Sequence, residues 1–364
     1  MNPVILRSLA AATLALAPAA ALAQDKVVNV YNWSDYIGEG VLDDFTKETG
    51  IKVVYDVYDS NEMLETKLLA GGSGYDIIVP SDRNLARMIQ AGVVQKLDKS
   101  KLPNLVNVWP AIAERLATYD PGNEYAVNYM WGTTAIGYNV DKIKERMPDA
   151  PVDSWDMIFK PEVVGKFADC GVQVLDSPDD LIPAALNYLG LDPNSKDPGD
   201  LAKAGDLLKS VRPSIQKFHS SEYINGLANG DICLAVGYSG DVLQARDRAA
   251  EAGNGVNIVY SIPKEGALIW LDAMSIPADA PHVDEAHAFI DFMNKPEIAA
   301  RNSNYVFYAN GNLASQEFLD EAVKSDTGIY PDEATFAKLY ATTAGDPRQQ
   351  REITRIWTEV KTGQ

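Results

Sequence analysis

Short apolar runs alternate with amphipathic segments along the first hundred positions of this chain. The runs at 27–31 and 51–58 are rich in Val and Tyr, which is typical of strands. Between them, the apolar residues of 39–48 recur at helical spacing. Ser60 stands where it can cap a second helix, and the glycine-rich segment 71–74 ends that helix.

A third apolar run at 75–80, followed by a helix from Ser81, completes a β-α-β-α-β order. This order predicts a mostly parallel sheet that is covered by helices on both faces. Further strands are predicted at 233–236, 256–262 and 269–276, and further helices at 200–208, 240–252 and 284–293. The 364 residues exceed what one core usually holds, so we expect two α/β domains. Because no low-complexity linker separates them, the chain is expected to cross between the domains inside strands.

The N-terminal segment 1–23 has the pattern of a secretory signal peptide. Arg7 precedes an apolar run at 9–22, and the segment ends in the small-x-small sequence Ala21-Leu22-Ala23. We predict cleavage after Ala23, which leaves an exported chain that begins at Gln24.

Charge and cysteine usage narrow the classes of function. The chain has 51 acidic and 32 basic residues, a formal net charge of -19. This balance disfavours nucleic acid, which needs clustered Lys and Arg, and suits a cationic ligand. Cys170 and Cys233 are the only cysteines, and an oxidising compartment would join them. The three histidines show no metal-ligand spacing, so we expect no metal.

Motifs of enzymes are incomplete in this sequence. Gly-Tyr-Ser-Gly-Asp at 237–241 differs from a nucleophile elbow, which needs Gly at its last position. The glycines of 71–74 lack the Gly-Lys-Ser/Thr that follows in a phosphate-binding loop. No set of Ser, His and Asp suggests itself. We therefore expect neither catalysis nor a cofactor.

Aromatic residues stand beside short acidic ones at several predicted strand ends. These residues are Trp33, Ser34, Asp35, Tyr36, Ser81, Asp82, Asp180, Tyr238, Asp241, Trp270, Asp272 and Tyr308. Ligands of open α/β sheets bind at the carboxyl ends of strands. Taken singly, each residue also fits a core position, a helix cap or a solvated turn. Together the twelve predict a ligand site with aromatic walls and carboxylate ends.

A linear organic polycation suits such a site. An ammonium group has three donors and no acceptor, so it needs carboxylates, hydroxyls or carbonyls. The methylenes between ammonium groups need apolar contact, and aromatic faces also attract cations. An amino acid would instead require an Arg for its carboxylate, and Arg83 is the one Arg in these segments.

Long sequence runs identify a resemblance that covers essentially the whole mature chain. They are VYNWSDYI at 30–37, KETGIKVVYDVYDSNE at 47–62, YDIIVPS at 75–81, YMWGTTAIGYN at 129–139, APVDSWD at 150–156, FHSSEYINGLANGDIC at 218–233, GYSGD at 237–241, SIPKEGA at 261–267 and GIYP at 328–331. The chain resembles the periplasmic polyamine-binding proteins of ABC transporters, which are putrescine and spermidine receptors of Gram-negative bacteria.

The resemblance implies a bilobed binding-protein fold with central mixed sheets and hinge strands that cross between the lobes. The expected lobes are 24–133 with 254–305, and 134–253 with 306–364. The resemblance also implies that Asp180 lies near one amine and that Tyr238 stacks on the alkyl chain. Asp241 and Asp272 match carboxylates for the other ammonium, and the cysteines match a pair that is bridged in the family.

Two positions depart from the family pattern. Asp82-Arg83 replaces residues that are usually small and uncharged, so the rim of the site is altered. Trp270 replaces a smaller Phe of some putrescine receptors, and an indole there resembles the spermidine-type receptors. From Trp270, we expect spermidine to bind at least as well as putrescine. The alternative that stays open is that Arg83 repels the far end of the longer ligand.

The implied function is a monomeric periplasmic receptor without catalysis. It would capture putrescine or spermidine between its lobes and deliver it to an inner-membrane ABC transporter permease. Two alternatives stay open at this point: an exported hydrolase-like α/β enzyme, and a polyamine sensor that uses the same site.

Overall fold

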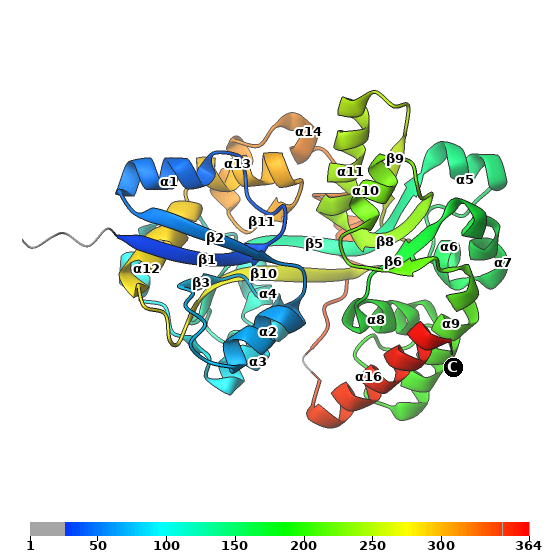
Figure 1. Cartoon of the computed structure of the whole chain (residues 1–364), viewed down its shortest axis with the longest axis horizontal. Helices are drawn as coiled ribbons and strands as arrows, with labels where there is room; N and C mark the ends of the chain where they lie inside the picture. The colour runs from blue at the N-terminus through cyan, green and yellow to red at the C-terminus, as the bar shows by residue number, and fades with distance from the viewer. Residues whose placement is uncertain (1–25, 344, 364) are drawn as a thin grey trace, which may run out of the picture.

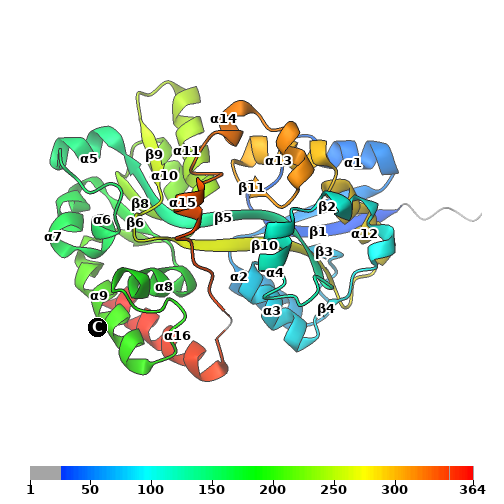
Figure 2. The ribbon, with the colours of Figure 1, turned by 180° about the vertical axis from the view of Figure 1, so that it is seen from behind.

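The computed structural model describes residues 26–343 and 345–363, and the predicted signal peptide lies outside them. Within these ranges, eleven strands form one sheet with the order β2-β1-β3-β10-β5-β8-β6-β7. β4 pairs with β10, whereas β9 and β11 pair with β5. Helices gather around the two ends of the sheet. Two long strands, β5 (Ala126–Asn139) and β10 (Leu268–Pro277), run between these two lobes (Figure 1, Figure 2).

The first lobe has the predicted β-α-β-α-β order. β1 (Val27–Trp33) pairs in parallel with β2 (Lys52–Tyr58) and with β3 (Ile77–Ile78). The helices that follow these strands are α1 (Val41–Thr49), α2 (Asn61–Leu69) and α3 (Asp82–Ala91). The predicted cap of α2 is confirmed, because the Ser60 side chain accepts a hydrogen bond from the backbone N–H of Met63.

The third strand is shorter than the predicted 75–80, and side chains explain its early end. The carbonyl of Val79 accepts hydrogen bonds from the Trp33 indole at 2.8 Å and from the Tyr58 hydroxyl at 2.5 Å. Side chains thus occupy an acceptor that a neighbouring strand would otherwise use. These side-chain hydrogen bonds lie at the carboxyl ends of the strands, where the ligand site is predicted.

The second lobe combines parallel and antiparallel pairs. β6 (Val172–Val174) pairs in parallel with β7 (Lys217–Phe218) and with β8 (Leu234–Tyr238). β8 and β10 both run antiparallel to β5, so the sheet is mixed, as the resemblance implied. Its helices are α5 (Val140–Arg146), α6 (Asp156–Phe159), α7 (Pro161–Val164), α8 (Pro178–Tyr188), α9 (Pro198–Val211), α10 (Tyr223–Ala228), α11 (Ser239–Ala252) and α16 (Pro347–Thr362).

The remaining elements are distributed over both lobes and their connections. They are β4 (Val94–Gln95), β9 (Ile258–Ser261), β11 (Ala309–Asn310), α4 (Pro110–Leu116), α12 (Val283–Met293), α13 (Pro296–Val306), α14 (Glu321–Lys324) and α15 (Glu333–Phe336), with short 3-10 turns at Lys99–Lys101, Pro103–Asn107, Gly165–Cys170, Arg212–Ser214 and Leu313–Glu317. The six later elements predicted from the sequence are confirmed to within three residues at each end. Of the described helices, none is long and apolar enough to cross a membrane.

The exact lobe boundaries stay a prediction, and one strand bears on them. β9 pairs with Ile136–Asn139, the end of β5 that also pairs with β8. The predicted boundaries assign β9 to the first lobe, whereas this pairing sets it against residues of the second.

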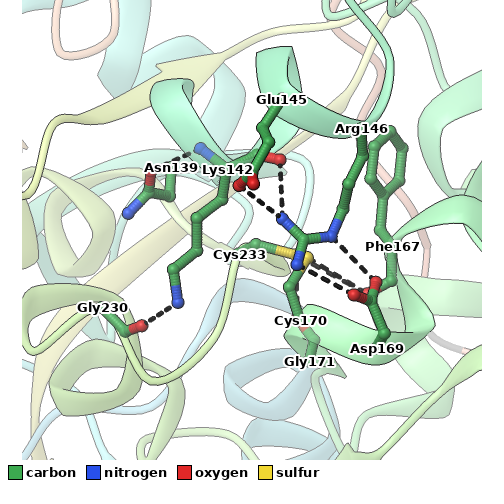
Figure 3. The surroundings of a disulfide bond; sticks show 10 residues. All are labelled: Asn139, Lys142, Glu145, Arg146, Phe167, Asp169, Cys170, Gly171, Gly230 and Cys233. Carbon is green, nitrogen blue, oxygen red and sulfur yellow. Dashed lines mark hydrogen bonds and ion pairs between the residues drawn. A yellow bond between two sulfur atoms is a disulfide. The ribbon is translucent and has the colours of Figure 1, made fainter.

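A disulfide joins Cys170 and Cys233, as predicted (Figure 3). Cys233 directly precedes β8, so the bridge lies at the opposite end of that strand from Tyr238. Next to the bridge, the guanidinium of Arg146 donates two hydrogen bonds to Asp169, at 2.8 and 2.9 Å. The bridge and this ion pair tie the start of β8 and the end of α5 to the turn that precedes β6.

We predict that replacing both cysteines by Ser lowers the free energy of unfolding by about 4 kcal/mol, because the bridge closes a long loop in the unfolded chain. Urea denaturation of the two forms measures this difference. Ligand affinity should change little, since the bridge lies at the far end of β8. A variant as stable as the wild type would contradict the structural role of the bridge.

Candidate functional site

A cleft lies between the lobes and is lined by residues of both. It encloses about 960 Å³ when its open mouth is counted. Its described lining carries eight carboxylates and one guanidinium. Such a surface attracts cations, in agreement with the charge of the whole chain.

Eleven of the twelve predicted site residues line this cleft. They are Trp33, Ser34, Asp35, Tyr36, Ser81, Asp180, Tyr238, Asp241, Trp270, Asp272 and Tyr308. Asp82 does not, contrary to expectation. Its buried carboxylate accepts hydrogen bonds from the backbone N–H groups of Arg83, at 2.6 Å, and Leu271, at 3.2 Å. The Asp82 carboxylate therefore joins α3 to β10 and does not line the cleft.

Asp241, in the first turn of α11, is held by two tyrosines. Its carboxylate accepts hydrogen bonds from the hydroxyls of Tyr308, at 2.6 Å, and Tyr223, at 2.8 Å. The Tyr308 oxygen in turn accepts from the backbone N–H of Asp241. Burial raises the pKa of Asp241 to about 6, although the two hydroxyls act to lower it. No lysine or arginine of the described chain forms an ion pair with this carboxylate.

Two glycines allow these rings to approach Asp241. A Cβ atom at Gly237 would lie 2.4 Å from the Tyr223 ring, and one at Gly240 would lie 2.4 Å from the Tyr308 ring. Both distances are shorter than real Cβ contacts. The Gly-Tyr-Ser-Gly-Asp sequence therefore builds a cradle for a carboxylate, which explains its partial likeness to a nucleophile elbow.

Asp272, on β10, lies between the lobes. Its carboxylate accepts hydrogen bonds from the hydroxyls of Ser81, at 2.6 Å, and Tyr36, at 2.9 Å. Burial raises the pKa of Asp272 to about 7 against these two donors. Trp270 lines the same cleft, which agrees with two positions on one face of an extended strand. The pairing of β10 with β5 shifts register after Asp272.

Asp180 repeats the arrangement in the second lobe, at the start of α8. It accepts hydrogen bonds from the hydroxyls of Ser177, at 2.5 Å, and Thr134, at 2.7 Å. Burial raises the pKa of Asp180, and the positive charge of Arg83 opposes this shift. The alternative of a solvated turn at this position is wrong, because Asp180 is buried.

Aromatic rings join these carboxylates into one wall. The Trp270 indole meets Tyr238 edge to face, with ring centroids 5.7 Å apart, and meets Tyr308 at 5.4 Å. Tyr36 meets Tyr308 in the same way at 5.2 Å. Edge-to-face contacts fix the orientation of each ring, so the wall is a preformed apolar surface.

Besides these ring contacts, two arginines connect the lobes across the cleft. The Arg83 guanidinium donates a hydrogen bond of 2.9 Å to the carbonyl of Asp179. A guanidinium nitrogen of Arg248 lies 3.6 Å from the Asp35 carboxylate. The two sides of the cleft are therefore in contact in this structure.

Thirteen of the lining residues are not among the twelve predicted site residues, although Asp179 stands beside Asp180 in the sequence pattern and Arg83 was expected at the rim of the site. They are Tyr58, Asp59, Ser60, Asn61, Glu62, Arg83, Asn84, Asp176, Ser177, Asp179, Ser220, Ser221 and Ile224. Ser60 and its neighbours follow β2, and the rule of strand carboxyl ends would have found them. The segments at 176–177 and 220–221 follow β6 and β7, strands of three and two residues that are too short to leave a sequence pattern.

Comparison with known proteins agrees with this architecture. The sequence profile of the bacterial extracellular solute-binding proteins matches residues 40–331. The chain belongs to this family. Among its relatives in the family, the putrescine-binding periplasmic protein SpuD of Pseudomonas aeruginosa is 53% identical, over 98% of each chain.

Two further comparisons support the assignment to solute-binding proteins. The putrescine-binding periplasmic protein PotF of Escherichia coli is 51% identical, over 97% of this chain and 96% of its own. The solved structure of the spermidine/putrescine ABC transporter substrate-binding protein PotD of Streptococcus pneumoniae superposes with a TM-score of 0.77 and 33% identity. It covers 93% of this chain and 99% of its own. The bilobed fold expected from the sequence is thereby confirmed.

We predict opposite pH trends for stability and for cation binding. The pKa of Asp272 is about 7 in the folded chain against 3.8 ordinarily, so the folded state binds more protons between these values. The free protein should therefore lose stability as the pH rises from about 4 to about 7. Over pH 6 to 8, affinity for an organic dication should rise, because Asp241 and then Asp272 ionise.

Calorimetry and thermal melts of the wild type and of Asp272→Asn test these trends. The variant should bind an organic dication about 10- to 100-fold more weakly at pH 8, since a neutral amide replaces one charged acceptor. Its melting temperature should also fall less than that of the wild type between pH 5 and pH 7.5. Identical pH profiles for the two proteins would show that Asp272 does not titrate in this window.

We predict that Gly240→Ala weakens cation binding and destabilises the fold by about 1–3 kcal/mol, because the added methyl displaces the Tyr308 ring from Asp241. Gly165→Ala is the matched control. A Cβ atom at Gly165 would lie 3.8 Å from the Ser214 hydroxyl, which is an ordinary van der Waals contact. Urea denaturation and calorimetry of both variants give the comparison. Equal behaviour of the two would contradict the cradle described for Asp241.

Proposed function

We propose that this chain is a periplasmic receptor that captures a polyamine of the putrescine or spermidine type in the cleft. One observation carries the proposal: Asp180, Asp241 and Asp272 are each held by two hydroxyl donors, and an aromatic wall joins Asp241 and Asp272. The putrescine-binding relatives support the same ligand class.

The chemistry of each group fits this ligand. A hydroxyl donor occupies part of the acceptor capacity of a carboxylate oxygen and leaves further lone pairs for an ammonium group. Hydrogen bonds that involve such charged groups contribute about 1.5–3 kcal/mol each. The rings of Trp270 and Tyr238 offer apolar surface to the methylenes and a negative face to the cation.

In this proposal, the receptor acts as a monomer in the periplasm, after removal of 1–23, and presents the closed, loaded lobes to an inner-membrane ABC transporter permease. A ligand held by both lobes binds the closed form better, so it shifts the population toward closure. The lobes comprise 24–133 with 254–305, and 134–253 with 306–364, with β9 packed against the second.

Binding without catalysis is part of the proposal. Histidine, cysteine and lysine are absent from the described lining of the cleft. His219 lies beside one lining serine, with its Nδ1 atom 3.4 Å from the Ser221 hydroxyl, but this nitrogen already accepts hydrogen bonds from the backbone N–H groups of Ser221 and Glu222. The hydroxyls of Ser81 and Ser177 donate hydrogen bonds to the carboxylates of the site. A polyamine sensor would use the same cleft, and the two roles differ in the partner that recognises the closed form.

We predict that putrescine raises the melting temperature of the ligand-stripped chain, whereas butylamine does not at the same concentration. Both amines have four carbons, but butylamine lacks the second ammonium. At a hundred times its Kd, a ligand stabilises the fold by about 2.7 kcal/mol. Thermal shift measurements with putrescine, spermidine and butylamine at one ionic strength test this. Equal shifts with putrescine and butylamine, or none with either polyamine, would refute the proposed function.

A further inference from the structure

Arg83 places a positive charge inside an acidic cleft. Among the described residues that line the cleft, it is the one Lys or Arg. Its side chain is only 11% exposed and donates across the cleft to the carbonyl of Asp179. Its Nε atom lies 3.9 Å from the Asp82 carboxylate and has no hydrogen-bond acceptor. A guanidinium is charged at every physiological pH, so this charge is permanent.

The carboxylates of Asp180, Asp241 and Asp272, each held by two hydroxyls, differ in whether the positive charge of Arg83 acts on them. Asp241 and Asp272 form no ion pair with a lysine or arginine anywhere in the described chain; Arg248 acts on Asp241 only from a distance and pairs with Asp35. For Asp180, by contrast, Arg83 is the strongest influence that favours the ionised form. Two carboxylates are therefore left for cations of a ligand, and the third already has a resident cation nearby.

We propose that Arg83 takes the place of a third ligand ammonium and limits the cleft to diamines, so that triamines are rejected. This inference rests on the proposed function, because it assumes that polyamines bind in the cleft. It assigns specificity to a residue that departs from the family pattern, and it reverses the preference for spermidine expected from Trp270.

The cost of admitting a triamine explains the rejection. Its third ammonium would approach the guanidinium near Asp180, and two like charges would then share one carboxylate. Moving Arg83 aside would break its hydrogen bond to Asp179 and leave a buried charge without a partner, which is strongly unfavourable. A diamine avoids both costs, because its two ammonium groups are satisfied by Asp241 and Asp272.

Calorimetry with putrescine and spermidine, on the refolded and ligand-stripped mature chain at one ionic strength, tests this inference. Arg83→Gln removes the charge but keeps an amide donor for the Asp179 carbonyl, and Arg83→Ala removes the side chain. Arg87→Gln is the matched control. It removes a charge one turn further along α3, where Arg87 pairs with Glu65 at 3.0 Å and does not line the cleft.

The wild type should bind putrescine more tightly than spermidine. Both Arg83 variants should raise the affinity for spermidine relative to putrescine by about tenfold or more, the size of one charge-assisted interaction. Arg87→Gln should leave that ratio at its wild-type value. Retained putrescine binding shows that each variant is folded.

Three outcomes would overturn the inference. They are a wild type that prefers spermidine, a ratio that stays constant in both Arg83 variants, and a ratio that shifts equally in Arg87→Gln. A wild type that binds neither amine would refute the proposed function itself. The failure of the specificity assignment and the failure of the function are therefore distinguished in one set of titrations.

Discussion

The structure depends on one constraint: carboxylates of the cleft are buried away from water without a positively charged partner. Asp241 and Asp272 are held by neutral hydroxyls alone, and burial raises their pKa values toward neutrality against the effect of these donors. Such groups destabilise the free protein at pH values where they are ionised. A bound organic cation would offset this unfavourable free energy. The destabilisation that the buried carboxylates cause in the free protein therefore favours binding of a ligand of opposite charge.

The fold supplies the hydroxyls and rings from distant parts of the chain. Tyr36 follows β1 and Ser81 precedes α3, yet both donate to Asp272 on β10. Tyr308 follows α13 and reaches Asp241 at the start of α11. The cleft is therefore assembled only when strands of both lobes are in register, which couples the geometry of the site to the integrity of the whole sheet.

Sequence patterns predicted the fold and most of the cleft because both follow from regular elements. Long strands and helices have clear periodicities. Residues at the carboxyl ends of long strands could be assigned to the cleft, because ligands of open α/β sheets bind at those ends. The misses have local causes. Asp82 has the same sequence context as a site residue, but its carboxylate turns to backbone N–H groups of Arg83 and Leu271. Ser177 and Ser221 follow strands too short to detect. Arg83 was expected at the rim, but its hydrogen bond to the carbonyl of Asp179 is revealed only by the tertiary structure.

The path of β5 and β10 through both lobes also sets the order in which the chain becomes able to fold. β5 pairs with β10 along most of its length, and β10 ends at Pro277. During synthesis, neither lobe can complete its sheet until more than three quarters of the chain has been made, and long-range pairing of this kind is slow. In the proposed periplasmic role, such a delay would keep the polypeptide unfolded while it crosses the inner membrane.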